Sequence, residues 1–175
     1  MSILKVARMG HPVLRAKSRP LDKAEIRSAA VQKLIDDMID TMVEYHGVGL
    51  AAPQVHEALR IFVAAIDDGD EEEGEATPFA LINPEITIVG ADVVEDWEGC
   101  LSIPDVRGRV PRAREITVRG VDRKGSAFEL RLHDFPARVV QHETDHLDGI
   151  LFFDRMRSFE TLTYLDEYGR YWAKD

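Results

Sequence analysis

DFPARVVQHETDHLDG (residues 134–149) predicts a helix at the centre of the fold. Asp134 is a candidate cap for its first turn, Pro136 suits that turn, and Gly149 is a typical stop. Several of the segments before this helix have strand-like patterns, so we expect it to pack against a sheet.

This helix carries the pattern H-E-x-x-H at His142, Glu143 and His146. Residues four apart share one face of a helix, so the two histidines are expected to point at the same metal ion. Glu143 is then placed to act as a general base. The alternative is a helix with two hydrogen-bonded core histidines. Two imidazoles leave a catalytic site one protein ligand short of the usual three.

The third ligand has two candidates. A metzincin layout is excluded, because Phe152 stands where that layout needs a third histidine. Glu167 lies 21 residues beyond His146, a spacing similar to that of thermolysin-like enzymes. Cys100 is the only cysteine of the chain, and a thiolate binds metals strongly. Residue types alone leave both candidates open.

The patterns elsewhere indicate an α+β fold. An amphipathic helix is expected over residues 24–45, ending near Gly47, and a C-terminal helix over about residues 158–172. Strands are expected over residues 60–66, 79–82, 85–95, 115–121 and 127–132, the last two joined as a hairpin. With no repeat or linker, residues 1–175 are expected to form one domain, with mixed or antiparallel sheets around the central helix.

The composition argues against two classes of function, DNA binding and membrane spanning. The formal net charge of the 175 residues is −10, and seven acids lie within residues 67–75, which suggests one solvated loop. The chain shows no basic face that would bind DNA. It has no apolar run of about 18 residues, so no membrane span is expected. A single cysteine fits a reducing compartment.

Three separated segments resemble the signature blocks of the peptide deformylase family. They are GVGLAAPQ (residues 47–54), EGCLS (residues 98–102) and QHETDHL (residues 141–147), in the family's order and spacing. The resemblance covers about residues 5–156. It implies a hydrolase that removes the formyl group from the N-terminal formylmethionine of newly made polypeptides and releases formate. The alternative is a zinc endopeptidase with Glu167 as third ligand.

The resemblance also implies a set of catalytic residues. It implies one divalent metal ion, Fe²⁺ in the cell, which Zn²⁺, Ni²⁺ or Co²⁺ can replace. The ligands that it implies are Cys100, His142 and His146. It implies that Glu143 transfers the proton, and that the Gln54 side chain and the Leu101 backbone N–H stabilise the oxyanion.

A second set of residues is expected to bind the substrate. Its members are Val48, Gly49, Leu50, Glu98, Arg107 and Val139. Val48 and Val139 are candidates for the methionine pocket, and Gly49 would let the peptide backbone approach closely. Gln141 and Asp145 are expected to orient the metal ligands.

The expected partners follow from the substrate. They are N-formylmethionyl nascent peptides, with transient association at the ribosome, in a bacterial cytoplasm. Docking on RNA through the C-terminal helix is not favoured, because residues 158–175 carry a net charge of −2.

Overall fold

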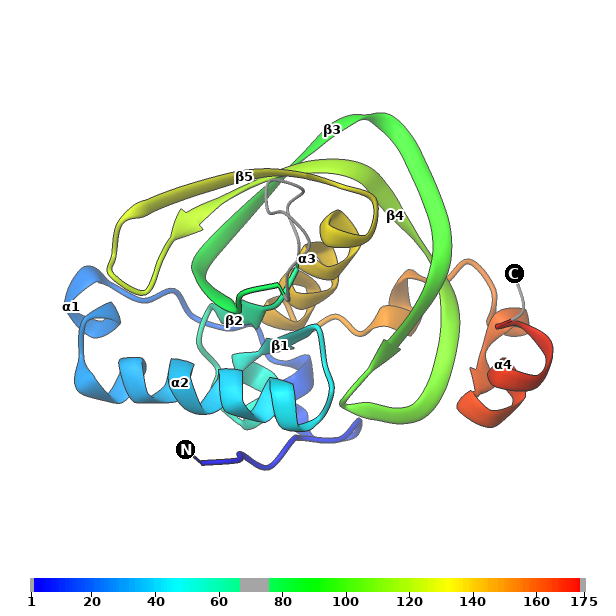
Figure 1. Cartoon of the computed structure of the whole chain (residues 1–175), viewed down its shortest axis with the longest axis horizontal. Helices are drawn as coiled ribbons and strands as arrows, with labels where there is room; N and C mark the ends of the chain where they lie inside the picture. The colour runs from blue at the N-terminus through cyan, green and yellow to red at the C-terminus, as the bar shows by residue number, and fades with distance from the viewer. Residues whose placement is uncertain (1, 67–75, 174–175) are drawn as a thin grey trace.

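A computed structural model describes residues 2–66 and 76–173 of the chain (Figure 1). The predicted acidic loop, residues 67–75, lies outside the described residues. Two long strands, β3 (Phe79–Cys100) and β4 (Ile103–Val121), run antiparallel and curve around helix α3 (Asp134–Leu147). This places the H-E-x-x-H helix inside a bent ribbon of strands, and the α+β prediction is confirmed.

The remaining elements extend this ribbon into one antiparallel sheet. The strand order is β1-β2-β3-β4-β5, and β6 pairs with β4. The other strands are β1 (Gly49–Ala51), β2 (Ile61–Ala64), β5 (Ala127–His133) and β6 (Thr163–Tyr164). Short 3₁₀ helices are η1 (Pro12–Arg15), η2 (Ala52–Val55), η3 (Phe152–Arg155) and η4 (Phe159–Thr161). The predicted hairpin between residues 115–121 and 127–132 is confirmed by the pairing of β4 with β5.

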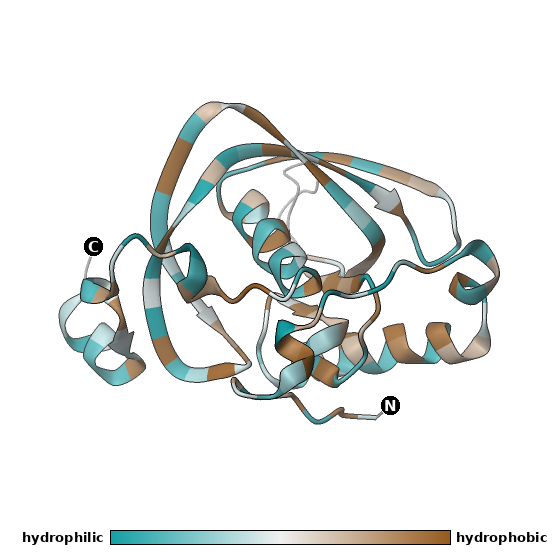
Figure 2. Ribbon diagram, turned by 180° about the vertical axis from the view of Figure 1, so that it is seen from behind, coloured by the Kyte–Doolittle hydropathy of each residue, from teal (hydrophilic) through white to brown (hydrophobic). Residues whose placement is uncertain are grey.

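The core lies on both faces of β2. Ile61 and Val63 pack with the apolar side of α2, whereas Phe62 and Ala64 belong to a second cluster that includes apolar residues of α3. All four are fully buried, and the apolar residues that recur along α2 are visible in Figure 2. Burial of side chains of this kind contributes roughly 1.5–3 kcal/mol each. These contacts hold α3 firmly against the sheet. Among the described residues, no helix is long and apolar enough to span a membrane.

The helix predicted over residues 24–45 is two helices, α1 (Lys23–Ile26) and α2 (Ala29–Glu44). Asp22 and Glu25 form a capping box around α1, and the Ser28 side chain accepts from Val31 N–H at 3.3 Å. Because a serine that caps a helix takes an extended backbone, it starts a new helix rather than continuing the previous one.

The two strands predicted over residues 79–82 and 85–95 are parts of the single strand β3. Asn83 lies between them with φ 52° at a shift of register. Its side chain bonds both backbone groups of Leu21, which compensates the local break in the ladder. Strand β4 begins at Ile103, earlier than the predicted start at residue 115. The prediction missed this part because it contains Pro104 and Pro111, and proline usually interrupts the hydrogen bonds between strands.

The cap predicted for α3 is wrong. The helix starts after His133, which occupies the cap position without a side-chain hydrogen bond, and Asp134 is its first residue with φ 53°. The Asp134 carboxylate instead bonds Arg114 at 3.0 Å. The helix ends at Leu147, and Gly149 follows with φ 74°, where a side chain would meet the Arg15 carbonyl oxygen at 2.6 Å. Glycine is therefore needed at this stop.

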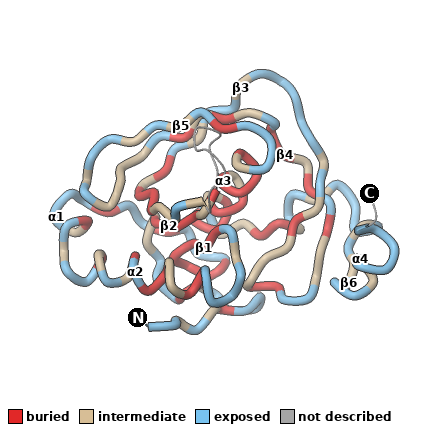
Figure 3. Tube along the Cα trace, in the orientation of Figure 1, coloured by how far each residue is buried: buried red, intermediate tan, exposed pale blue. Residues whose placement is uncertain are grey.

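The C-terminal helix predicted over about residues 158–172 is wrong in its first half. That half contains η4 and β6, and only Leu165–Tyr171 is helical, as α4. The large apolar side chains whose spacing suggested this helix stay exposed: Phe159, Leu162, Leu165 and Trp172. Figure 3 shows this segment at the edge of the molecule without buried residues, in contrast to the buried centre at α3, β1 and β2.

Candidate metal centre and cleft

The structure brings Cys100, His142 and His146 together. Cys100 ends β3, and the two histidines lie one turn apart on α3. Cys100 Sγ is 3.3 Å from His146 Nε2, which is 3.2 Å from His142 Nε2. All three ligand atoms lie within 4.8 Å of one another. The alternative third ligand, Glu167, is on α4 and bonds Arg170 at 2.7 Å; it is not part of this group.

The donor set fits a divalent metal. His142 Nδ1 lies 2.9 Å from a Glu98 carboxylate oxygen, which can only accept, so Nδ1 carries the proton. In the neutral ring, Nε2 then presents its lone pair to the site. Two imidazole nitrogens and one thiolate suit Zn²⁺, Fe²⁺, Co²⁺ or Ni²⁺.

The charges around Cys100 favour its thiolate. Burial raises the pKa of this thiol, but the charge of His146 and a hydrogen bond from His142 outweigh burial and hold the pKa well below its ordinary value. Burial lowers the pKa of His142, but its hydrogen bonds to Cys100 and Glu98 outweigh burial and raise it. Without a metal, the group is thus a thiolate beside an imidazolium, and a cation that binds there displaces the proton.

Glu143 faces the same cleft from α3. It is 4 % exposed, and its Oε2 has no hydrogen-bond partner among the described residues. Burial raises the pKa of Glu143. A Cβ added at Gly49 would lie 2.4 Å from Glu143 Oε1, so only glycine leaves room for this carboxylate. A buried carboxylate with a free oxygen and a raised pKa is suited to accept and return a proton.

Gln54 has its amide fixed in one orientation. Its Oε1 accepts from the Ala51 N–H at 2.8 Å, so the NH₂ group points toward the site. Nε2 lies 3.5 Å from Cys100 Sγ and 3.3 Å from Ser102 Oγ. Leu101 follows Cys100 and lines the same cleft. The structure thus places both predicted oxyanion donors, Gln54 and Leu101, next to the metal ligands.

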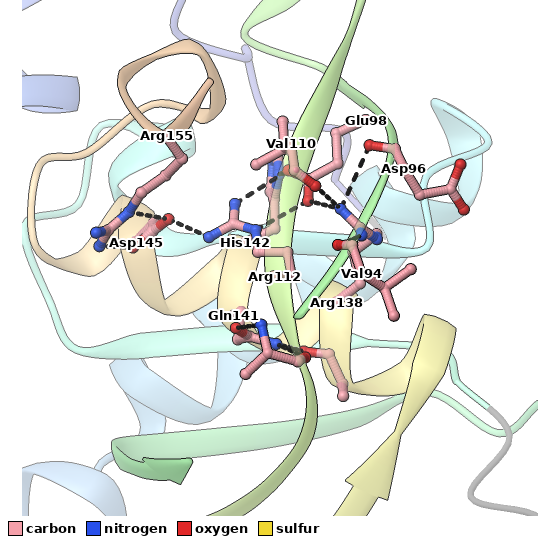
Figure 4. Close-up of polar contacts among 12 residues, drawn as sticks. Val94, Asp96, Glu98, Val110, Arg112, Arg138, Gln141, His142, Asp145 and Arg155 are labelled. Carbon is pink, nitrogen blue, oxygen red and sulfur yellow. Dashed lines mark hydrogen bonds and ion pairs between the residues drawn. The ribbon is translucent and has the colours of Figure 1, made fainter. Parts of the chain in front are cut away.

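A buried network of charges holds the ligand helix in place (Figure 4). Arg112 bonds both oxygens of Glu98, at 2.9 and 3.0 Å, and reaches Asp145 at 2.5 Å. Arg138 also bonds Glu98 at 2.8 Å, and Arg155 bonds Asp145 at 2.7 Å. Burial raises the pKa of Glu98, but the hydrogen bonds from His142 and Arg112 outweigh it and hold the pKa far below its ordinary value.

These contacts revise two expected roles. Glu98 was expected at the substrate, but both its oxygens are occupied by His142, Arg112 and Arg138, so its contacts favour orientation of His142. Gln141 does not touch a metal ligand, because its amide bonds both backbone groups of Ala113. It ties α3 to β4.

A cleft of ≈ 810 Å³ opens over this centre. The predicted substrate-binding residues that line it are Val48, Gly49, Glu98, Arg107 and Val139. Leu50 is not among them, because its side chain is fully buried in the core beside α2. The Arg107 guanidinium covers Gly99, where a Cβ would lie 1.8 Å from Nη1. The cleft therefore has an apolar side, a cationic group and the metal ligands at one end.

Several residues of the site were not predicted to have a role there. Those in the network or the cleft wall are Trp97, Ser102, Arg112, Phe135, Arg138 and Leu165. Arg138 lies four residues before His142, so the helical spacing already puts both on one face. Trp97 and Leu165 have no such signal, because only the fold brings them to the same cleft.

Comparison with known proteins places this site in a family. Residues 3–161 match the family model described as polypeptide deformylase. The chain is 44 % identical over 158 residues to peptide deformylase 2 of Nostoc sp., which covers 89 % of this chain and 87 % of that protein. It is 45 % identical over 157 residues to the peptide deformylase of Halothermothrix orenii, covering 89 % of this chain and 95 % of that protein.

A solved structure agrees with the fold. The Met-Ala-Ser-bound class I type b peptide deformylase of Acinetobacter baumannii superposes with a TM-score of 0.81 at 38 % identity, covering 89 % of this chain and 100 % of that one. The family model, the relatives and the solved structure agree, and the chain belongs to the polypeptide deformylase family.

Proposed function

We propose a division of roles among Cys100, His142, His146, Glu143 and Gln54 in a deformylation reaction. As a member of its family, the chain is a metal-dependent hydrolase that removes the formyl group from the N-terminal formylmethionine of nascent peptides. The observation that supports the residue roles is the convergence of three ligand atoms beside a buried carboxylate with a free oxygen.

Cys100, His142 and His146 would hold the metal. When bound, such an ion acts as a Lewis acid and lowers the pKa of a water molecule toward neutrality. We propose Fe²⁺ in the cell, with Zn²⁺, Ni²⁺ or Co²⁺ as replacements, because a borderline-soft set of two nitrogens and one sulfur suits all four. Glu98 keeps His142 in the tautomer that binds metal.

Glu143 moves the proton. Its carboxylate accepts a proton from the water that attacks the formyl carbon, so that a C–O bond forms. It then gives this proton to the amine nitrogen as the C–N bond breaks, which releases formate and a free N-terminal methionine. The unpartnered Oε2 supports this role, because it needs no hydrogen bond to be broken first.

Gln54 and Leu101 stabilise the developing negative charge. The Gln54 NH₂ group is held toward the site by the bond from Ala51 N–H to its Oε1, so it needs little reorganisation when charge appears on the carbonyl oxygen. The Leu101 N–H is the second donor in this proposal. Loss of one such donor costs about 10²–10³-fold in turnover in other enzymes.

The cleft takes an extended peptide. Val48, 43 % exposed, and Val139 offer apolar surface for the methionine side chain, while Arg107 is placed to meet the peptide backbone. The related Acinetobacter baumannii enzyme was solved with Met-Ala-Ser bound, which supports a peptide of this kind. Nascent chains as substrate also support transient ribosome association and action in a bacterial cytoplasm.

Formate release from formyl-Met-Ala-Ser by anaerobically prepared, iron-loaded protein tests these roles. We expect turnover in the parent, loss of metal and activity in Cys100→Ser, and full activity in Glu167→Ala. A Cys100→Ser variant that kept its metal and its formate release, together with an inactive Glu167→Ala variant, would instead make Glu167 the third ligand.

A further inference from the structure

We propose that the C-terminal segment, residues 162–173, forms a wall of the substrate cleft, where Trp97 and Leu165 bind an apolar side chain two residues after the formylmethionine. This inference rests on the proposed function and adds a substrate preference to it. The segment lies beyond residues 3–161, the part of the chain that matches the family model.

The segment is anchored at the cleft. Strand β6 pairs with β4, with Tyr164 opposite Val106 and Thr163 opposite Arg107. Val106 and Arg107 both line the cleft. The backbone pairing therefore fixes the start of α4 at the cleft edge, and Figure 1 shows α4 beside the curved end of the β3–β4 ribbon.

Aromatic packing connects this segment to Trp97 on β3. The Trp97 ring lies edge-on to Tyr168, with centroids 4.9 Å apart, and tilted against Trp172, with centroids 5.6 Å apart. Trp97 is half-buried and also lines the cleft. The C-terminal segment thus packs against one side of the Trp97 indole, while another side faces the substrate cleft.

Leu165 completes an apolar surface at this position. It is the first residue of α4, it is 42 % exposed, and it lines the same cleft as Trp97 and the metal ligands. A single exposed leucine is ordinary on a protein surface. Leu165 is the one residue of the described segment 162–173 that lines the cleft, which favours a role in contact with the substrate.

The spacing along β3 indicates which residue of the substrate lies at Trp97. Trp97 precedes Cys100 by three residues, which corresponds to about 10 Å along a strand. In an extended peptide the third residue lies at a similar distance, about 10 Å, from the formyl carbon. With the formyl group at the metal centre, the third side chain reaches the level of Trp97 and Leu165.

Peptides that differ at the third residue test this subsite. The experiment measures kcat/KM for formyl-Met-Ala, formyl-Met-Ala-Ser and formyl-Met-Ala-Phe with the parent, Leu165→Ala and the matched control Leu162→Ala. Leu162 is 41 % exposed in the same segment but does not line the cleft. Because the subsite is half open, we expect the parent to prefer phenylalanine over serine by about threefold to tenfold, less than an enclosed pocket gives.

Leu165→Ala should reduce this preference to about twofold or less and leave formyl-Met-Ala unchanged, since the dipeptide does not reach the wall. Leu162→Ala should keep the parent's preference. An unchanged preference in Leu165→Ala, or an equal fall for all three peptides, would overturn the proposal. Absence of turnover of formyl-Met-Ala in the parent would instead count against the proposed function.

Fluorescence tests the wall without catalysis. The chain has two tryptophans, Trp97 and Trp172, and both belong to this cluster. In the Trp172→Phe variant, titration with Met-Ala-Phe should change the emission of Trp97 saturably, and Met-Ala-Ser should bind about threefold to tenfold more weakly. Equal affinity for the two peptides would contradict the subsite even if the enzyme showed no turnover.

Discussion

At the metal end of the cleft Glu98 and Arg112 are 6 % and 5 % exposed, whereas at the C-terminal end Leu165 and Trp172 are 42 % and 48 % exposed. The first end consists of buried charges that satisfy one another, and the second of aromatic rings that remain partly in water. A buried charge without its partner is costly, so the first end tolerates only one arrangement. The second end has no such constraint, because its side chains remain partly exposed to water.

Removal of one member of the buried network should have the largest effect. Glu98→Ala leaves Arg112 and Arg138 without their shared carboxylate, and we expect a loss of about 3–5 kcal/mol in the free energy of unfolding. Metal affinity should fall by about 10–100-fold, because His142 loses its orienting acceptor. Urea denaturation and metal titration measure the two effects. A loss below about 1 kcal/mol, the size typical of exposed ion pairs, would show that the network contributes little.

The same glycine-to-alanine change should affect the two ends differently. Gly49→Ala places a methyl group 2.4 Å from Glu143 Oε1, and displacement of this carboxylate by about 1 Å should cost on the order of 100-fold in kcat. Gly169→Ala on α4 meets nothing within 4 Å and should leave kcat unchanged. The comparison requires equal metal content in both variants. If Gly49→Ala were as active as the parent, this result would contradict the role of Glu143 in the proton transfer.

Acid should weaken the metal end through Glu98. Its pKa is lowered in the folded protein, so its contribution to stability is present above the ordinary value of 4.5 and is lost as pH falls toward the lowered pKa. We expect metal-free parent protein to lose stability below this pH more steeply than Glu98→Gln, which has no carboxylate to protonate. Unfolding free energies between about pH 7 and 3 measure the difference, which should be constant above the ordinary pKa. Parallel curves would contradict the assignment.

The smallest effect is expected at the aromatic end. Tyr168→Ala removes one ring from Trp97, and we expect a loss of about 0.5–1.5 kcal/mol beyond the lost area. Turnover of formyl-Met-Ala should be unchanged, because no metal ligand depends on this contact. Thermal unfolding and formate release measure both quantities. A fall in dipeptide turnover as large as that of Gly49→Ala would mean that the two ends are mechanically coupled.

The sequence predicted which residues gather at the metal end, because helical spacing alone puts His142 and His146 on one face and the signature blocks supply Cys100 and Gln54. It did not predict the buried ion pairs that hold these residues in position. Arg112 follows a proline in a segment with two prolines, and nothing local shows that it contacts both Glu98 and Asp145. Such contacts depend on the curvature of β3 and β4 around α3.

The errors at element boundaries have local causes. The side chain of Ser28 favours a cap over a continuous helix, and Asn83 interrupts the register without ending its strand. The C-terminal helix was overextended because the apolar spacing of Phe159, Leu162 and Leu165 is helical in period. In the structure, residues Thr163 and Tyr164 instead form strand β6, which pairs with β4, so the helix starts only after them.

Formate release by Glu143→Gln, with its metal content measured in the same sample, tests the proposed mechanism most directly. Glutamine keeps the size of the side chain but cannot accept the proton. We expect metal binding equal to that of the parent and a loss of turnover of at least about 100-fold. Parent-like turnover at equal metal content would show that Glu143 does not transfer the proton and would contradict the mechanism proposed for this site.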